Sequence, residues 1–201
     1  LSGLSCSQMD FNPLRGELHS SVLKSLQASC TFEMKNYLKH GISRMDMDNH
    51  TSNMLLAGCD NGSILLYNLA NNISGGKFAP IKCLDKHQSV ISHVQWYPTD
   101  NGAFISSCLS GQLLVWDTNA FEVAGEFDVE GKIYCSSMRR DSAHSMIAVG
   151  TSTPNVRLCD LNSASYCQTL RHTSSVYCVD WSPQGAHILV SGTQDGAIHV
   201  W

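Results

Sequence analysis

The chain of 201 residues carries 13 lysines and arginines against 17 aspartates and glutamates, so its formal net charge is −4. The basic residues are scattered, and Arg139-Arg140 is the one adjacent pair. Because sequence-independent binding to nucleic acid needs a basic face that neutralises phosphates, we expect no direct contact with nucleic acid.

No apolar run approaches the length of a membrane span, and no basic-then-apolar signal segment opens the chain, so we expect no membrane association. The nine cysteines are odd in number and form no Cys-x-x-Cys pair, which argues against a zinc or redox site. We therefore expect a reducing, intracellular compartment and no cofactor. Four cysteines lie in or beside strand-like runs, as small core residues do: Cys108, Cys135, Cys159 and Cys178.

Residues 1–30 form the first predicted element, an N-terminal helical extension. Asn12 followed by Pro13 is typical of a helix start, because proline at the first helical position loses no hydrogen bond. An apolar residue then recurs every fourth position and makes one face of the helix apolar. Two interpretations stay open: the helix packs on the domain that follows, or it docks into a groove of a partner. The anchors would be Leu14, Leu18, Val22 and Leu26.

Residues 31–39 form the second predicted element, a strand. Phe32 and Met34 alternate with Glu33 and Lys35, and this period of two is typical of a strand with one buried face.

Residues 40–201 contain four copies of one pattern, each made of short strand-like runs separated by turns such as Asp195-Gly196. The copies close at intervals of 49, 43 and 42 residues, at Tyr67, Trp116, Cys159 and Trp201. This is the period of a four-stranded propeller blade of the WD40 type. The sequence therefore predicts an all-β fold, a WD40-type β-propeller with four blades in this chain.

Closed propellers have about four to eight blades, and most WD40 rings have about seven. We therefore expect an incomplete ring here, the N-terminal part of a longer protein or a truncated product of it. In such a ring the strand at residues 31–39 would serve as the outer strand of the last blade and close the ring.

The last copy holds the four residues that form a buried hydrogen-bond chain in WD repeats: His172, Ser191, Asp195 and Trp201. We expect this structural tetrad to lock its blade. These residue types recur with the repeat, so we interpret them as structural and not as a catalytic triad.

The second copy keeps His87, Ser106 and Trp116 but has Ser110 at the aspartate position. We expect that blade to be less rigid. No Gly-x-Ser-x-Gly, phosphate loop or metal-ligand spacing occurs, so we expect no enzymatic activity and no catalytic or metal-binding residues.

Several stretches carry a closer resemblance to a known family. They include residues 12–15 (Asn-Pro-Leu-Arg), 93–98 (His-Val-Gln-Trp-Tyr-Pro), 115–119 (Val-Trp-Asp-Thr-Asn), 148–151 (Ala-Val-Gly-Thr) and 181–183 (Trp-Ser-Pro). Residues 158–161 read Leu-Cys-Asp-Leu where WD repeats usually have Leu-Trp-Asp, which makes this match more specific. Along nearly its whole length the chain resembles the Cockayne syndrome protein A family, WD-repeat proteins of transcription-coupled DNA repair.

The resemblance implies a substrate receptor of a cullin-RING E3 ubiquitin ligase in transcription-coupled nucleotide excision repair, working in the nucleus. In that family the N-terminal segment inserts into the adaptor damaged-DNA-binding protein 1, and the propeller presents protein substrates of the transcription-repair machinery. Leu18, Val22 and Leu26 are expected adaptor contacts on the apolar pattern alone. Residue matching to the family gives five more: Leu1, Leu4, Pro13, Leu14 and Arg15.

Two alternatives belong to the same non-catalytic class. One is a generic WD-repeat scaffold in a chromatin or RNA-processing complex, and the other is a truncated paralogue without repair function. Adaptor-binding propellers often carry Trp-Asp-x-Arg, and residues 116–119 and 159–162 lack that arginine.

Overall fold

The computed structural model describes residues 40–70, 79–139, 145–182 and 187–201. The chain divides into two compact units, Leu1–Phe32 and Glu33–Trp201, and every described residue belongs to the second. The predicted helical extension and the predicted ring-closing strand lie outside the described residues, and both stay predictions.

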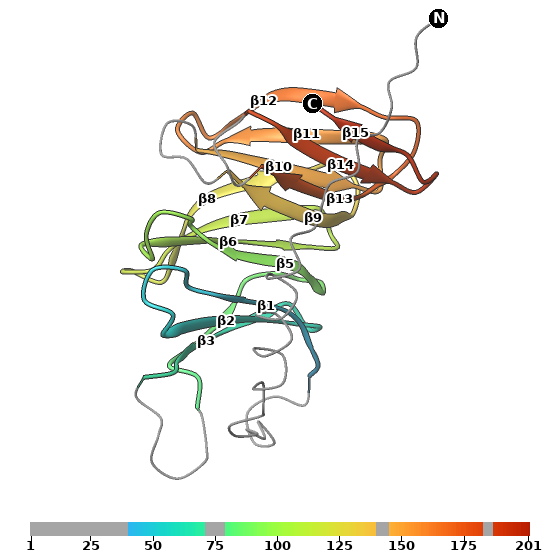
Figure 1. Ribbon diagram of the computed structural model, residues 1–201. Helices are drawn as coiled ribbons and strands as arrows, with labels where there is room; N and C mark the ends of the chain where they lie inside the picture. Colours follow the sequence, from blue (N-terminus) through green and yellow to red (C-terminus); the bar gives the residue numbers. More distant parts are fainter. Residues whose placement is uncertain (1–39, 71–78, 140–144, 183–186) are drawn as a thin grey trace, which may run out of the picture. The chain divides into compact units, whose positions relative to one another are not determined.

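In the described ranges, fifteen strands form four antiparallel sheets, which we call blades 1 to 4 (Figure 1). Blade 1 contains β1 (Ile42–Met47), β2 (Met54–Cys59), β3 (Ser63–Asn68) and β4 (Lys82–Asp85). Blade 2 contains β5 (Ile91–Trp96), β6 (Ala103–Cys108), β7 (Gln112–Asp117) and β8 (Glu122–Asp128). Blade 3 contains β9 (Ile133–Met138), β10 (Met146–Thr151), β11 (Asn155–Asp160) and β12 (Ser165–Arg171). Blade 4 contains β13 (Val176–Trp181), β14 (Leu189–Thr193) and β15 (Ile198–Val200).

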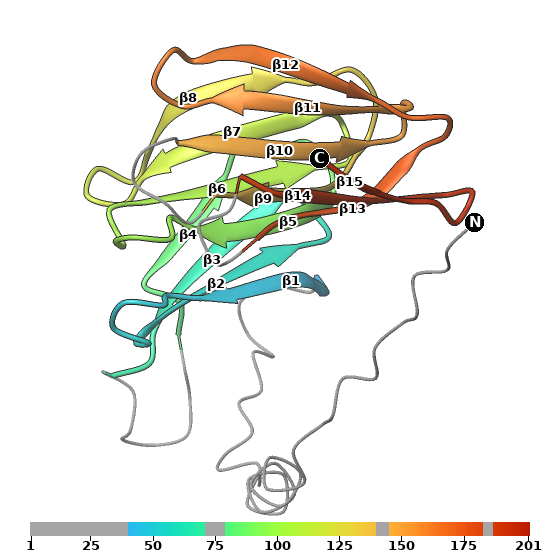
Figure 2. The ribbon, with the colours of Figure 1, turned by 45° about the horizontal axis from the view of Figure 1, so that its top comes forward.

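Each strand pairs with its neighbours in chain order, so every blade is a simple meander. Figures 1 and 2 show each blade lying beside the next one in the sequence, and the first strands of successive blades, β1, β5, β9 and β13, are in contact. We call these four the inner strands. The predicted all-β fold with four successive propeller blades is confirmed.

The core lies between the blades because each blade has two apolar faces. Leu56 and Leu66 are paired across β2 and β3, share one face of blade 1, and pack against Trp96 and Phe104 of blade 2. Phe104 is fully buried and stacks on Trp116 with ring centroids 5.6 Å apart. Burying one side chain of this size contributes about 1.5–3 kcal/mol, so these interfaces stabilise the blades against each other.

The turns between the second and third strands of blades 1, 2 and 4 each contain a glycine with positive φ, at Gly62, Gly111 and Gly196. L side chains rarely adopt this conformation. A Cβ on Gly111 would also lie 2.4 Å from the carbonyl oxygen of Val129, so this turn touches the chain that enters blade 3. Glycine at position 111 is therefore required twice, by its own φ and by the approach of the next blade.

Two of the four cysteines expected in the core are fully buried, Cys108 and Cys159, and Cys135 is partly buried. Cys178 is exposed, which corrects the expectation for that residue. It pairs with Gly192, where a Cβ would lie 2.7 Å from the Cys178 sulfur, and it lines a cavity beside the inner strands. In the described part of the chain, no helix is long and apolar enough to cross a membrane.

Candidate functional site

The histidine, serine and tryptophan of blade 2 form one buried chain. Trp116 Nε1 donates to Ser106 Oγ at 2.8 Å, and His87 Nε2 lies 2.6 Å from the same oxygen. All three residues are buried, and Ser106 is fully inaccessible. These three residues are linked although Ser110 stands at the aspartate position. The lower rigidity expected of blade 2 stays a prediction.

Blade 4 repeats the chain with one correction. Trp201 Nε1 donates to Ser191 Oγ at 2.8 Å, and His172 Nε2 lies 2.7 Å from that oxygen. The predicted tetrad also included Asp195, but the structure places that carboxylate outside the chain. Asp195 accepts hydrogen bonds from the hydroxyls of Thr173 and Thr193.

The reason for this correction is local. Asp195 occupies an exposed turn, and its short side chain reaches the neighbouring threonine hydroxyls. The hydrogen bonds from Thr173 and Thr193 hold its pKa well below the usual range for an aspartate. Trp201 is 39% exposed, so the chain of blade 4 is less buried than that of blade 2.

Blades 1 and 3 replace this polar chain with apolar packing. In blade 3 the register places Val149 and Cys159 at the serine and tryptophan positions, and both are fully buried in one cluster with Val129. Blade 1 has Ala57 and Tyr67 at the same positions, also buried together. Exchanging all partners of a buried hydrogen bond for apolar groups can be nearly neutral for stability. Hydrogen-bonded side chains in blades 2 and 4 can therefore occur in the same fold as apolar packing in blades 1 and 3.

The His-Ser pairs serve the fold. Burial lowers the pKa of His87 to about 4, so its ring is neutral near pH 7. A serine nucleophile must be reached by its substrate, whereas Ser106 and Ser191 are fully buried and each accepts an indole N–H. The arrangement therefore ties the second and third strands of a blade to the loop that precedes its first strand.

A second repeated contact joins each inner strand to the next. The side chain at the fifth position of one inner strand accepts the backbone N–H at the sixth position of the following one. Asp46 accepts from Trp96 at 2.7 Å, Gln95 from Met138 at 2.8 Å, and Ser137 from Trp181 at 3.4 Å. We call this series the inner-strand ladder.

The inner strands also line a polar cavity of about 410 Å³. Burial lowers the pKa of His93 in its wall to about 4, and the nearby Arg44 guanidinium acts in the same direction. His93 Nδ1 lies 3.1 Å from Ser136 Oγ, and Ser137 donates to Asp180 at 3.0 Å. In the described ranges, no three His, Cys, Asp or Glu side chains lie together as a metal site requires.

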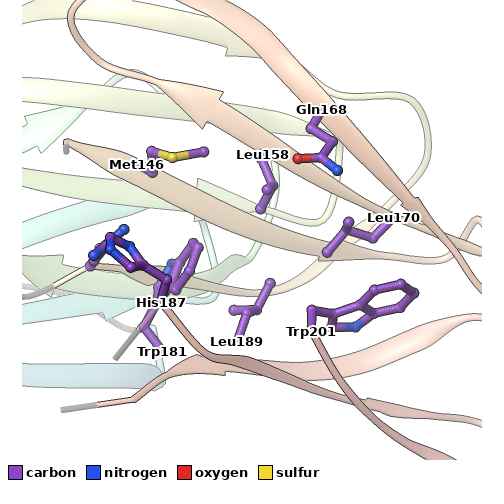
Figure 3. Close-up of a pocket in the computed structure, with 9 residues that line it drawn as sticks. Met146, Leu158, Gln168, Leu170, Trp181, His187, Leu189 and Trp201 are labelled. Carbon is purple, nitrogen blue, oxygen red and sulfur yellow. The ribbon is translucent and has the colours of Figure 1, made fainter. Parts of the chain in front are cut away.

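A more apolar groove of about 370 Å³ lies between blades 3 and 4 (Figure 3). Side chains from the two blades face each other across it, with Leu158 and Leu170 on one side and Leu189 and Trp201 on the other. Arg139 also lines the groove, and its guanidinium lies 5.7 Å from the ring centroid of Trp181. This combination of apolar walls and one cation suits an apolar or aromatic side chain.

The residues expected to contact an adaptor all lie outside the described residues: Leu1, Leu4, Pro13, Leu14, Arg15, Leu18, Val22 and Leu26. Their predicted role stays a prediction. Sequence reasoning missed the inner-strand ladder and the groove. The acceptors of the ladder are Asp, Gln and Ser, so no residue type recurs that could reveal it.

Comparisons with known proteins agree with the assignment of the sheets as WD40-type blades. The family model described as "WD domain, G-beta repeat" matches residues 78–117 and 164–201. WD repeat-containing protein ATCSA-1 of Arabidopsis thaliana is 32% identical over 94% of this chain and 45% of its own length. Radiation-sensitive protein 28 of Saccharomyces cerevisiae is 25% identical over 59% of this chain and 25% of its own length. GATOR2 complex protein WDR24 of Danio rerio is 24% identical over 74% of this chain and 19% of its own length.

The chain thus spans less than half the length of these relatives. Each segment matched by the family model contains one His-Ser-Trp chain: the first ends at Asp117, one residue after Trp116, and the second ends at Trp201. The described residues therefore form four blades of a WD40-type β-propeller, and two stretches of the chain match the WD-repeat model.

Proposed function

We propose that this protein is a non-catalytic substrate receptor of a cullin-RING E3 ubiquitin ligase that acts in transcription-coupled nucleotide excision repair in the nucleus. The observation that carries the proposal is the 32% identity to ATCSA-1 over 94% of the chain. A lower similarity links the chain to Radiation-sensitive protein 28, whose name points to a response to radiation damage. The match to ATCSA-1 agrees with the resemblance to the Cockayne syndrome protein A family that the sequence motifs carry.

The geometry of the blades supports a scaffold. The polar groups that could suggest catalysis, His87 with Ser106 and His172 with Ser191, are occupied in structural hydrogen bonds. The accessible features of the described residues include turns, a polar cavity and a groove. Surfaces of this kind can bind other proteins, and function on a common fold depends on such sites.

In the proposed division of labour, the N-terminal segment docks on the adaptor damaged-DNA-binding protein 1 through its apolar stripe. The blades present a protein substrate of the transcription-repair machinery. A helix that lays one apolar face into a groove buries its anchors together, and a few such anchors carry most of the binding energy.

Affinity purification of the tagged protein from cells, followed by mass spectrometry, tests the proposal. The adaptor and a cullin should be enriched over a tagged WD-repeat protein of another class. The matched control carries Leu14→Asp and Leu18→Asp and should lose both proteins. Absence of the adaptor and the cullin from the purified complex would contradict the proposal.

The alternative is a generic scaffold of a different assembly. It is favoured by relatives at 22–24% identity that include GATOR2 complex protein WDR24, dynein axonemal intermediate chain 4 and protein transport protein Sec31A. The same purification separates the two proposals, because chromatin or RNA-processing subunits would then replace the ligase components.

A further inference from the structure

The tripeptide Asp-Asn-Gly occurs twice in the chain, at residues 60–62 and 100–102. The first copy forms the turn between β2 and β3 of blade 1, and the second lies in the connection between β5 and β6 of blade 2. An asparagine side chain before glycine is open to attack by the main chain, because glycine has no side chain that shields its nitrogen. The two copies therefore allow one reaction to be compared in two surroundings.

The reaction is the loss of the side-chain amide of asparagine. The backbone nitrogen of the glycine bonds to Cγ of the asparagine and passes its proton, through water, to Nδ2. The bond from Cγ to Nδ2 breaks, ammonia leaves, and a cyclic succinimide remains. Water then opens the ring at either carbonyl. One opening gives aspartate, and the other gives isoaspartate, in which the main chain runs through the former side chain.

The surroundings of Asn61 favour this attack. Its Oδ1 accepts the backbone N–H of Ser63 at 3.1 Å and the Ser63 hydroxyl at 2.6 Å. Negative charge develops on this oxygen when a nitrogen adds to Cγ, and donors already in place stabilise that charge. The same bonds hold the carboxamide against the main chain at Gly62, where the attacking nitrogen lies. Asn61 is exposed, so water reaches the reacting group.

The Gly62 nitrogen is only weakly engaged. Its N–H donates to the carbonyl oxygen of Cys59 at 3.3 Å, which is long for a hydrogen bond. The neighbouring carboxylate of Asp60 is turned to other partners: Oδ2 accepts the Gly41 N–H at 3.0 Å, and Oδ1 lies 3.4 Å from His40 Nδ1. The attack at Asn61 therefore has no strong hydrogen bond to break.

The second copy has the opposite arrangement. The Gly102 N–H donates to Asp100 Oδ1 at 2.8 Å, so a carboxylate holds the nitrogen that would have to attack. A Cβ on Gly102 would lie 3.1 Å from the same oxygen, so the carboxylate lies close over this glycine. Residue 103 is alanine, which has no hydroxyl to do what Ser63 does in the first copy. Deamidation of Asn101 must first break a charge-assisted hydrogen bond.

We propose that Asn61 is a site of spontaneous deamidation, at which the fold promotes conversion to isoaspartate and aspartate. The same three residues are reactive in the turn of blade 1 and protected in blade 2. Water is the only co-reactant. The proposal is independent of the receptor function, because it concerns a covalent change in the blades themselves.

Isoaspartate at position 61 disturbs the contact between blades 1 and 2. Gly62 has a positive φ, and a Cβ there would lie 2.4 Å from the carbonyl oxygen of His87 and 2.9 Å from that of Ser89. The turn therefore has no room for the additional main-chain carbon that isoaspartate introduces. The isoaspartate form should melt at a lower temperature than the unmodified protein, whereas Asn61→Asp, which keeps the main-chain length, should melt close to it.

Peptide mapping by mass spectrometry, after incubation of the protein at mildly alkaline pH, measures both deamidation rates. Synthetic peptides of residues 57–66 and 97–106 give the rates of the two sequences without the fold. In the protein, Asn61 should react about tenfold or more faster than Asn101, because the Gly102 N–H is bound to a charged group. Asn61 should also react at least as fast as its own peptide, and fragment spectra should identify isoaspartate among the products.

Three substitutions test the cause of the difference. Ser63→Ala removes the hydroxyl on Oδ1 and should slow deamidation of Asn61 about threefold or more, whereas Ser63→Thr keeps it and should retain the rate. Asp100→Ala frees the Gly102 N–H and should raise the rate of Asn101 towards that of its peptide, with Asn61 unchanged as the internal control. Thermal melts of the three variants show that the fold survives.

The outcomes that overturn the proposal are also defined. A rate for Asn61 below that of its peptide would mean that the cover of blade 2 over Gly62 protects this site. Equal rates at Asn61 and Asn101, or a rate at Asn61 that Ser63→Ala leaves unchanged in a folded protein, would show that the hydrogen bonds of the turn do not promote the reaction.

Discussion

Trp116 donates its indole N–H to Ser106 at 2.8 Å, and both residues lie in the interior of blade 2. The bond fixes a large side chain of β7 on β6, where its ring also stacks on Phe104. Because no water reaches Ser106, the loss of its hydroxyl would leave both the indole and the His87 ring without this partner.

Replacing Ser106 by alanine should therefore destabilise the protein by about 2 kcal/mol or more, since each stranded buried polar group costs about 1–3 kcal/mol. Ser191→Ala is the matched control in blade 4. Its effect should be smaller, because Trp201 is 39% exposed and water can replace the serine. Urea unfolding of both variants measures the two losses. A larger loss of stability for Ser191→Ala would show that burial does not determine how much the His-Ser-Trp hydrogen bonds contribute to stability.

Asp195→Ala should lower the melting temperature less than Ser106→Ala does. The carboxylate stands outside the His-Ser-Trp chain and holds only the turn at Thr173 and Thr193. Asp195→Asn keeps an acceptor oxygen and should recover most of the loss. If Asp195→Ala matched Ser106→Ala in a thermal melt, the aspartate would belong to the tetrad after all.

Stability should fall between pH 6.5 and about 4 because of two buried histidines. The pKa of His87 and of His93 is lowered from 6.5 to about 4, chiefly by burial. Below pH 6.5 these histidines are protonated in the unfolded chain but stay neutral in the folded protein until the pH approaches 4. The contribution of the neutral rings is thus complete above pH 6.5 and is lost as the pH falls. The limit is about 3 kcal/mol for each histidine.

Melting temperatures measured from pH 7.5 to 4.5 check this prediction. His93→Gln removes one of the two titrating groups and keeps a side chain that can bond to Ser136, so its profile should be flatter. A profile as steep as that of the wild-type protein would show that His93 does not contribute.

The inner-strand ladder should protect single amides from exchange with solvent. Asp46→Ala removes the acceptor of the Trp96 N–H and should speed hydrogen exchange at that amide about tenfold or more, since hydrogen bonds to charged groups contribute about 1.5–3 kcal/mol. The Met138 amide, bound to Gln95, is the internal control and should be unaffected. Equal acceleration at both amides would indicate general destabilisation instead of a broken local bond.

Gly111 and Gly196 form a matched pair for the turns. Both have positive φ, but a Cβ at Gly111 would lie 2.4 Å from the Val129 carbonyl oxygen, whereas a Cβ at Gly196 would meet nothing within 4 Å. Gly196→Ala should cost about 1–2 kcal/mol for the strained φ alone. Gly111→Ala should cost clearly more, because blade 3 must shift as well. Equal losses in chemical denaturation would contradict the blade contact.

One pattern of short strand-like runs and turns recurs in the sequence every 42 to 49 residues, and this repeat was enough to predict the blades. Gly111 marks a turn because the positive φ there favours glycine. Trp116 and Trp201 mark the closing strands because a large side chain is needed at those positions. The hydrogen-bond donors to Asp195 could not be predicted from the sequence. A carboxylate in this turn could accept from the histidine or from the nearby threonines, and only the three-dimensional geometry decides between them. The ladder escaped prediction for another reason: Asp46 and Trp96 are 50 residues apart, and only the backbone of Trp96 takes part.

The groove between blades 3 and 4 also depends on three-dimensional register. Leu158 and Gln168 become neighbours only through the pairing of β11 with β12.

Direct titration of the purified adaptor, damaged-DNA-binding protein 1, into this protein is the most direct test of the proposed receptor function. The wild-type protein should bind, and Leu14→Asp with Leu18→Asp should weaken the affinity at least about thirtyfold, as expected for two anchors together worth 2 kcal/mol or more. Ser20→Asp with Lys24→Asp places the same side chains on the opposite face of the predicted helix and should bind as the wild type does. Loss of thermal stability in the leucine variant with unchanged adaptor affinity would contradict the account, because the helix would then pack on its own blades.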